Sequence, residues 1–571
     1  MGLRIAAATY PGHFHAVSCL RAVPDARMGR GTSYAALNGT LMGFASPLSR
    51  RLSRKRTARS IPLAIERTAI ALSLGLYSAL LVYVIPRHEP WSDEAQAWEL
   101  AKSLSLKDLF GTYIHYEASP GLWHSLLWLL ARAHVSYNGM HWFTAAIVMA
   151  AMVLLTTKAP FPLVLRLLLP FTYFFAFQYP VVARSYALFP VLLFALAWNW
   201  PQRKQNPLLS VLLIGLLANV SVHGLLVAIG LVVILSIERY RSRKEEGVGG
   251  KSEIVCAVLL IVMLGFAAWS IAPARDAGWV KIANWHVAQN RVAAKIGSLN
   301  VEERATNTHS AVVQVELAGG ILERATAALG SGLSDFHIGL IAWGLLIWGW
   351  VRGGTFRYGL PVLFLWAFCA AYTFQFYHAG LFWVLFLFLW WVTYPQNGGR
   401  ESRGELSKLD WRQMALLGSV VLCVISQLIW AARAIRYDVS MPYSAHRDAA
   451  NILKGYLARG MMADIAIPPD NKGSGAFSIT GIEPYFESEP ISNMPFRFWF
   501  WGEGFDGGMR STFLEDSVNR RAVVIVIENG DVQSMEKRLE SIGYRRAQVV
   551  CGQMFYPAYL PLPICYAFYE P

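Results

Sequence analysis

Two adjacent carboxylates, Asp93 and Glu94, lie in the stretch PWSDEAQAWELAKS at residues 90–103, directly after an uncharged apolar run at 68–85. A carboxylate in such a place can take a proton from a reacting hydroxyl group and so act as a general base. The plainer alternative is that both acids only favour the positive end of a helix dipole. Their position at the exit from an apolar run favours the chemical interpretation.

The residues around the pair indicate a helix with one apolar side. Trp91, Ala95 and Trp98 recur at helical spacing and would share that side. Asp93 would then point away from it, and Ser92 could serve as the N-cap.

Other side chains with chemical potential lie in separate segments that we expect to meet at the same membrane surface. Arginine and lysine can hold a phosphate and stabilise it as it leaves, and charged groups at membrane depth are costly unless they have a function. The candidates for substrate or phosphate binding are Arg184, Tyr186, His115, Glu117, Lys281 and His378.

Each of these candidates also has a structural alternative. Arg184 could be a positive anchor or could pair with a structural carboxylate. His115 with Glu117 is expected to be a hydrogen-bonded pair rather than a metal site, because two ligands do not make a zinc site. His223 and His378 could simply be residues of short turns at the membrane interface.

The composition points to a membrane protein. The chain has 571 residues, of which 55% are hydrophobic and 15% charged, whereas about 25% is usual for charged residues in soluble proteins. The net charge of +14 could suggest a nucleic-acid partner, but the basic residues cluster in short segments between apolar runs. That pattern is typical of anchoring at the cytoplasmic surface, so we expect no nucleic-acid partner.

The apolar runs predict a polytopic α-helical membrane protein with about eleven spans. The stretch 207–237 is too long for one span and is divided near 219–224, and the short run 121–133 is taken as an interfacial helix. The predicted spans lie at 68–85, 140–157, 162–179, 185–200, 207–237 (two spans), 254–271, 336–351, 358–377, 379–394 and 414–432.

The distribution of basic residues orients these spans. With the amino terminus in the cytoplasm, the basic connectors fall on the cytoplasmic side. Residues 1–65 then form a basic, disordered cytoplasmic segment, and 66–432 form the membrane module. The segments 87–139 and 272–335 become loops outside the membrane.

Residues 433–571 are expected to form an extracytoplasmic α/β domain. Helices are predicted at AHRDAANILKGYLARG and DVQSMEKRLESIG, and strands at RAVVIVIE, AQVVC and CYAFYE. Cys551 and Cys565 lie in this tail and could form a disulfide.

Three motifs together resemble a known family. SDEAQAW after the first span, HYEASPGLWHSLLWLL further along the loop, and ARSYAL are similar to segments of the GT-C superfamily of polyprenyl-phosphate-sugar glycosyltransferases. That superfamily includes the protein O-mannosyltransferases and the aminoarabinose transferase of lipid A. The resemblance covers about residues 65–400. The chain departs from it at Ala118, where some members have lysine, and at Ser119–Pro120, where they have two prolines.

The resemblance implies an inverting glycosyltransferase in a bacterial inner membrane. Asp93 would be the base and Glu94 its support, with Arg184 and loop cations on the donor phosphate. The donor would be a polyprenyl-phosphate-linked sugar, and the acceptor a lipid, a glycan or a protein. A divalent ion is compatible with this chemistry, although no ligand spacing supports a metal site. The alternatives are a transporter or flippase and a non-catalytic membrane scaffold.

Overall fold

The computed structural model describes residues 62–246, 251–277, 321–334, 336–371, 376–394, 411–466, 474–494, 496–499, 517, 519–527, 532–554 and 562–571. Nearly all of the predicted amino-terminal segment 1–65 lies outside these residues, as does the candidate Lys281.

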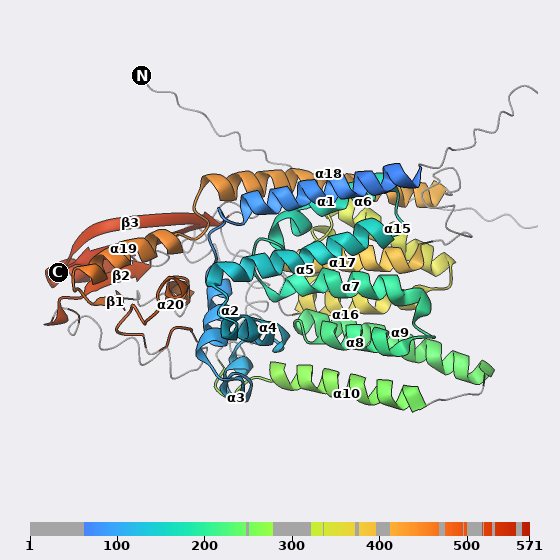
Figure 1. Ribbon diagram of the computed structural model, residues 1–571, viewed down its shortest axis with the longest axis horizontal. Coiled ribbons are helices and arrows are strands. Elements are labelled where there is room, and N and C mark those ends of the chain that lie inside the picture. Colours follow the sequence, from blue (N-terminus) through green and yellow to red (C-terminus); the bar gives the residue numbers. More distant parts are fainter. Residues whose placement is uncertain are drawn as a thin grey trace, which may run out of the picture. The chain divides into compact units, whose positions relative to one another are not determined.

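Helices that pack side by side form the larger part of the chain (Figure 1). This helical module contains α1 (Leu63–Val84), α5 (Tyr137–Lys158), α6 (Leu163–Leu168), α7 (Leu188–Asn199), α8 (Pro207–Ala218), α9 (Val222–Glu246), α10 (Lys251–Ile271), α14 (Ile321–Gly330), α15 (Phe336–Arg352), α16 (Leu360–Ala371), α17 (Phe376–Thr393) and α18 (Trp411–Ser440).

Five of the described helices are long and apolar enough to cross a membrane, by length and composition. They are Leu63–Val84, Tyr137–Lys158, Val222–Arg241, Glu253–Ile271 and Trp411–Ser440. Shorter apolar helices cover Pro207–Ala218, His337–Arg352, Phe356–Ala371 and Tyr377–Thr393. The chain is therefore mostly helical with several candidate membrane spans, and the count of about eleven stays a prediction.

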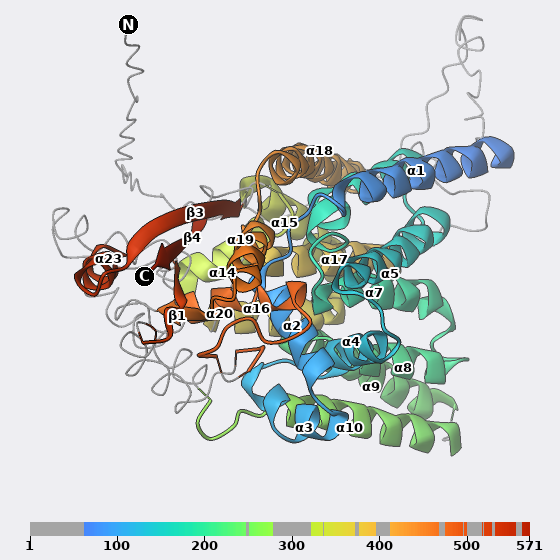
Figure 2. The same cartoon turned by 60° about the vertical axis from the view of Figure 1, so that its left-hand side comes forward.

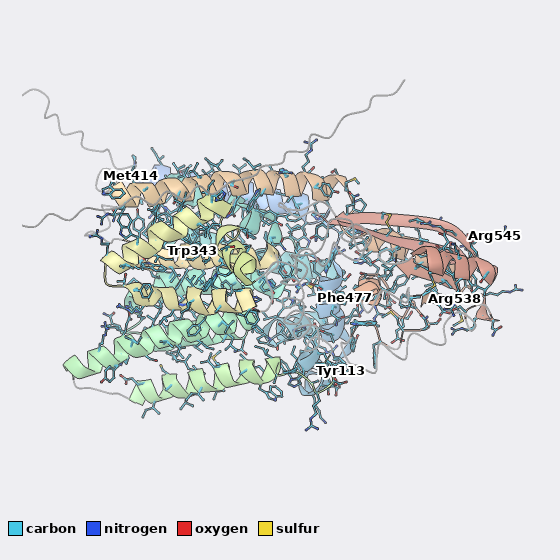
Figure 3. The ribbon with its side chains drawn as sticks, turned by 180° about the vertical axis from the view of Figure 1, so that it is seen from behind. Tyr113, Trp343, Met414, Phe477, Arg538 and Arg545 are labelled. Carbon is cyan, nitrogen blue, oxygen red and sulfur yellow. A yellow bond between two sulfur atoms is a disulfide. The ribbon has the colours of Figure 1, made fainter. Side chains whose placement is uncertain are left out.

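The centre of the module is α17. Its residues 381–389 are apolar without interruption and have no exposed surface. A helix that is apolar on all sides must be covered on all sides, and α7, α14 and α15 pack against it. Trp343 of α15 is buried against Phe386 of α17, and Figure 3 shows it within the module.

The predicted division of 207–237 is confirmed as a break between α8 and α9. At this break the Asn219 side-chain amide donates to the carbonyls of Gly215 and Met263 at 2.8 and 3.0 Å, which joins α8 to α10. Further along α9, Gly230 lies so close to α16 that a Cβ atom there would be 2.6 Å from the Cα atom of Pro361.

One expectation for this module is wrong in detail. Residues 162–179 do not form one helix: α6 is followed by the 3₁₀ turn η3 (Leu169–Phe171) and the π-helical segment η4 (Phe174–Gln178). Pro170 has no amide hydrogen for a regular helix. The predicted loop 272–335 contains α14, which packs against α15 and α16.

The first connection after α1 contains α2 (Ser92–Ser103), α3 (Leu106–Gly111), η2 (Tyr113–Tyr116) and α4 (Leu122–Arg132). The predicted helix at the Asp93–Glu94 pair is confirmed as α2, with Ala95 and Trp98 buried on its apolar side. The predicted short helix at 121–133 is confirmed as α4, which packs against α2. Ser92 is not the N-cap, which is Trp91, because the helix begins one residue earlier than expected.

The carboxyl-terminal part contains a four-stranded sheet in the order β1-β2-β4-β3. β1 and β2 are parallel and the other neighbours are antiparallel. Its elements are α19 (His446–Ala458), β1 (Ala463–Ala466), α20 (Ser474–Ile479), η10 (Glu483–Tyr485), β2 (Val523–Ile527), α23 (Val532–Ser541), β3 (Arg545–Met554) and β4 (Leu562–Glu570).

The predicted strands and helices of this tail are confirmed, while β1 and α20 were not expected. Every residue of β2 is buried, because Val523 and Ile525 face the main core and Val524 and Val526 face a second core with α23. Cys551 and Cys565 are opposite each other on β3 and β4 and form a disulfide. Arg538 and Arg545 are exposed at the outer end of the tail (Figure 3).

The tail is bound to the first connection by buried polar contacts. The Glu89 carboxylate accepts the backbone N–H groups of Ser444, Ala445 and Arg447 at the start of α19, at 3.4, 2.9 and 2.5 Å. These N–H groups have no partner inside a helix, so the acid caps the helix from another segment. The His446 ring donates to the Pro90 carbonyl at 2.9 Å. Figure 2 shows α20 beside α2.

A second set of contacts lies along α2 itself. Arg497 binds Glu99 at 2.8 Å, and the Glu99 side chain is fully buried. Gln96 exchanges hydrogen bonds with the backbone of Trp499. Arg433, the expected start of the tail domain, lies inside α18, which continues to Ser440. The tail thus begins directly after α18 and binds one side of α2 through Arg497 and Trp499.

We predict that Arg497→Met lowers the free energy of unfolding by about 3–5 kcal/mol, because it leaves the Glu99 carboxylate buried without its partner. Thermal unfolding of the purified protein in detergent measures this. The double variant Glu99→Gln/Arg497→Met should regain much of the loss. The exposed pair Arg459–Glu570 supplies the control: Arg459→Met should cost less than about 1 kcal/mol. Equal costs for the two single variants would contradict the prediction.

Candidate functional site

The candidate site is organised around the buried carboxylate of Glu94. It accepts the backbone N–H of Trp91 at 2.7 Å, which closes the first turn of α2, and the backbone N–H of Ala183 at 2.6 Å. His141 Nε2 lies 3.0 Å from it and His88 Nε2 lies 3.6 Å away. Glu94 therefore joins α2 to α5 and to the turn before η5 (Ser185–Ala187).

These contacts decide the charge of the carboxyl. Burial alone would raise the pKa of Glu94, but hydrogen bonds and charge from His141 and His88 hold it well below its usual range. Burial would likewise lower the pKa of His88, but Asp438 at 2.9 Å and Glu94 raise it to about 10. The group is thus a buried ionic network in which Glu94 supports the loop and does not face solvent.

Asp93 is the exposed member of the acid pair. Its carboxylate forms an ion pair with Arg184, and both side chains are a little over one quarter exposed. The pairing follows from the backbone. Because Glu94 binds the N–H of Ala183, the neighbouring residues Asp93 and Arg184 are brought together. Asp93 and Arg184, from separate segments of the chain, are therefore in contact.

A buried row of polar rings continues from Arg184. The Arg184 guanidinium carbon lies 6.0 Å from the ring centre of Tyr186 and 5.9 Å from that of Tyr377. The Tyr186 hydroxyl is 3.0 Å from His378 Nε2, within hydrogen-bond distance. The rings of His378 and His223 lie 4.2 Å apart. Four predicted residues, Asp93, Arg184, Tyr186 and His378, are therefore gathered in one place.

The inner part of this row is buried: Tyr186 is 8% exposed and His378 is 5% exposed. A phenol is uncharged at neutral pH, so Tyr186 is a neutral hydrogen-bond donor. Within the described part of the chain, neither ring nitrogen of His223 has a hydrogen-bond partner, although the residue is only 5% exposed. An unsatisfied buried imidazole is costly and suggests a ligand.

The other predicted site residues lie elsewhere or outside the description. His115 donates from Nδ1 to the Ala272 carbonyl at 2.7 Å and contacts Trp269 at the end of α10. Glu117 accepts a hydrogen bond from Gln96 at 2.8 Å, and burial raises its pKa to about 7 against the effect of that bond. Lys281 lies outside the described residues.

Metal binding has little support. Across the described residues, no group of three or more His, Cys, Asp or Glu side chains could hold a metal ion. His115 is hydrogen-bonded to the Ala272 carbonyl and Glu117 to the Gln96 side chain. Asp93 with Arg184 offers one carboxylate already paired with a cation.

Several site residues were not identified from the sequence. His88 and His141 contact Glu94 from the end of the first span and from α5, and Glu89 and Asp438 belong to the same joint with the tail. The sequence did offer one signal for His88 and His141: each is an ionisable residue at the end of an apolar run, where such residues often have a function. The carboxylate that each histidine contacts could not be inferred from the sequence, because Glu94 and Asp438 lie in other segments of the chain.

No protein-family model, no curated protein and no solved structure matches this chain. The fold and the site therefore define a class only: a mostly helical chain with candidate membrane spans, a small carboxyl-terminal sheet, and a charged site at the joint between them.

The buried network predicts a pH dependence of stability. Because the pKa of His88 rises from 6.5 to about 10 on folding, its contribution is complete below pH 6.5 and is lost as pH rises towards 10. The stability difference between wild type and His88→Gln should be largest at pH 6 and shrink by on the order of 3–5 kcal/mol by pH 10. Unfolding of purified protein across this range measures it. A constant difference would contradict the prediction, and the exposed His134→Asn is the control.

Proposed function

We propose that the chain is an integral-membrane glycosyltransferase, which moves a sugar from a polyprenyl-phosphate donor to a hydroxyl acceptor at the extracytoplasmic face. Asp93 is the general base, and Glu94 holds the loop that carries it. Arg184, assisted by Tyr186 and His378, binds the donor phosphate. The motif resemblance and the side-chain geometry support this proposal together.

The observation that carries the proposal is the partly exposed ion pair between Asp93 and Arg184 at the head of a buried polar row. A donor phosphate is a stronger partner for a guanidinium than a single carboxylate oxygen, because it can accept two hydrogen bonds. When Arg184 turns to the phosphate, Asp93 loses its cation and becomes a better base. Donor binding would in this way prepare the base for the acceptor.

The reaction would proceed as one displacement at the anomeric carbon. The acceptor O–H gives its proton to Asp93 while its oxygen forms a bond to the anomeric carbon. The bond from that carbon to the phosphate oxygen breaks, and the electron pair leaves with the polyprenyl phosphate. One displacement without a covalent enzyme intermediate inverts the configuration.

The leaving phosphate needs donors that are already in place. Arg184 supplies charge, and the neutral Tyr186 phenol, 3.0 Å from His378, supplies a hydrogen bond beside it. Donors fixed by their surroundings stabilise a leaving group without reorganising. The His223 ring, 4.2 Å from that of His378, extends the same row, and its two unsatisfied nitrogens are available to the donor.

We predict that Asp93→Asn reduces transfer by about 10²–10⁴-fold, because the amide cannot accept the hydroxyl proton. The measurement is comparative mass spectrometry of envelope glycolipids, glycans and glycoproteins. Wild type, a deletion strain, and the deletion carrying Asp93→Asn at normal protein level are compared. A sugar should vanish in the deletion and stay absent with Asp93→Asn. Asp108→Asn, which changes an exposed acid of the same connection, should restore it.

Restoration of every sugar by Asp93→Asn would reject Asp93 as the base. It would favour the transporter or scaffold alternatives.

We further predict that His378→Gln lowers the turnover rate by about 10²-fold, as expected for a group that stabilises a leaving phosphate. His115→Gln should have little effect, because His115 lies against α10 and away from the row. Initial rates with the donor identified by mass spectrometry separate the two. A larger loss for His115→Gln than for His378→Gln would place the donor phosphate near His115 and not at the row that begins at Arg184.

A further inference from the structure

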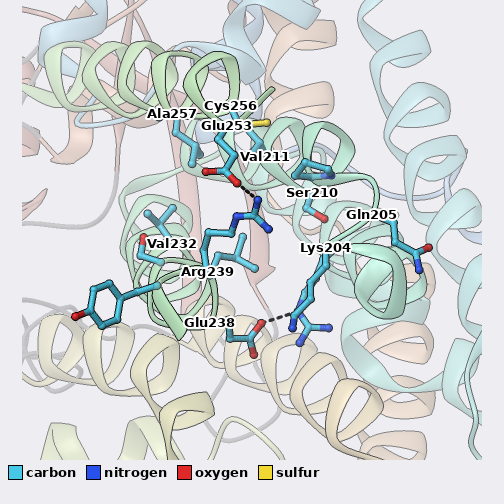
Figure 4. A pocket seen from close by; sticks show the side chains of 16 residues that line it. Lys204, Gln205, Ser210, Val211, Val232, Glu238, Arg239, Glu253, Cys256 and Ala257 are labelled. Atoms are coloured by element: carbon cyan, nitrogen blue, oxygen red, sulfur yellow. Dashed lines mark hydrogen bonds and ion pairs between the residues drawn. The ribbon is translucent and has the colours of Figure 1, made fainter. Parts of the chain in front are cut away.

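Two cavities of the chain differ in what their polar groups do. One, of about 450 Å³, lies between α8, α9 and α10 (Figure 4). Its ion pairs Arg203–Glu238 and Arg239–Glu253 join α9 to the connection before α8 and to α10, so these charges stabilise the packing of helices. The other, of about 640 Å³, lies on the tail between α19 and the strands β3 and β4, where α19 packs beside β3 (Figure 1).

The tail cavity is separate from the candidate active site. α19 begins at His446, whose ring bonds the Pro90 carbonyl, whereas the cavity is lined by the later part of the helix, from Asn451 to the C-cap Arg459. Gly455 is nine positions beyond His446, which is roughly 14 Å of helix at about 1.5 Å per residue. A ligand there would be bound by the tail itself.

The described lining of this cavity offers hydrogen-bond donors and acceptors without a net charge. Asn451 and Gln548 contribute side-chain amides, each with an N–H₂ donor and a carbonyl acceptor. The charged residues of the described lining are Arg459 and Glu570, which pair with each other at 3.4 Å. An ion of either sign would meet one like charge, whereas a hydroxyl group can accept from Arg459 and donate to Glu570. The lining therefore suits a neutral ligand rich in hydroxyl groups.

Apolar surface lies beside these polar groups. Ile452, Ala547 and the buried Tyr456 line the cavity. The Tyr456 ring stacks on Phe568 at 5.9 Å, and the Arg459 guanidinium carbon lies 4.4 Å from the centre of the Tyr456 ring. Arg459 is thus held in place by the tail's own side chains. A pyranose ring carries C–H groups beside its hydroxyls, and it matches a lining that is partly apolar and partly polar.

Two local irregularities open the cavity. Gly455 lies inside α19, where glycine is less favourable than alanine. A Cβ atom there would meet nothing within 4 Å, so no packing contact requires the glycine, and its missing side chain leaves room in the cavity that it lines. On the facing strand, the pairing of β3 with β4 shifts between Arg546 and Gln548. Bulges re-aim side chains, and Ala547 and Gln548 both line the cavity.

We propose that this cavity binds a neutral sugar unit of a glycan through the Asn451 and Gln548 amides and the Arg459–Glu570 pair. A peptide strand would instead need the backbone groups at the edge of β3, and a bulge interrupts that row. The proposal does not depend on Asp93 being a base, because the cavity lies apart from Asp93. It gives the tail a binding role beside its contacts with α2.

The test uses the full-length purified protein, in a detergent without a sugar head group, and saturation-transfer difference NMR. The probes are the methyl glycosides of glucose, galactose, mannose and N-acetylglucosamine. Methyl glucuronide is the anionic comparison, and acetyl-tetraglycine amide is the peptide comparison. We expect at least one neutral glycoside to bind, and to bind more tightly than both comparison probes.

Variants locate the binding. Gln548→Ala should weaken the bound glycoside by about fivefold, as for one lost hydrogen bond. Gly455→Leu should abolish binding while the melting temperature stays equal or rises, because leucine favours a helix and fills the open space. Ala458→Leu, at an exposed position of α19 outside the cavity lining, should leave binding unchanged. Asp93→Asn should bind the glycoside as wild type does.

Four results would overturn the proposal. The first is no binding of any neutral glycoside, and the second is binding of a comparison probe as tight as that of the best glycoside. The third is unchanged binding in both Gln548→Ala and Gly455→Leu. The fourth is loss of binding in Asp93→Asn, which would place the sugar at the candidate active site. Because binding and transfer are measured separately, restoration of transfer by Asp93→Asn would reject the proposed transferase mechanism and leave the tail site standing.

Discussion

Glu94 carries a negative charge although its side chain has no exposed surface, and the segments around it supply the hydrogen bonds which that charge requires. A buried carboxylate without partners would cost several kcal/mol, so α2, α5 and the turn at Ala183 must meet with little freedom. The exposed ion pair of Asp93 with Arg184 then follows from geometry. The two adjacent acids thus have different roles: Glu94 fixes the first turn of α2 against its neighbours, and Asp93 extends from that turn towards Arg184.

Local features of the site could be predicted, and distant pairings could not. α2 and its exposed Asp93 follow from helical spacing and from the apolar run before it. His88 bonds Asp438, which is 350 residues away, and nothing near either residue indicates the other. The broken helix at 169–178 was missed because its residues are as apolar as those of a regular span, and only Pro170 marked the break.

The tail has a closer relation to the site than its position in the sequence indicates. Its described contacts include Glu99 and Gln96 of α2, the helix that carries Asp93, and Glu89 just before that helix. Gln96 of α2 links the tail to Glu117, because its side chain bonds the Trp499 backbone and also donates to Glu117. The half-buried acid Glu117 is therefore placed by the tail and by α2 together.

The cap on α19 has a consequence for synthesis of the protein. Glu89 emerges early, whereas Ala445, whose N–H it accepts, comes 356 residues later. At about 5–20 residues per second, the acid waits roughly 20–70 s for its partners on the ribosome. During that time the segment that bears Asp93 lacks one of its supports. Completion of the chain therefore adds this support last, and chains cut short before residue 445 would lack it.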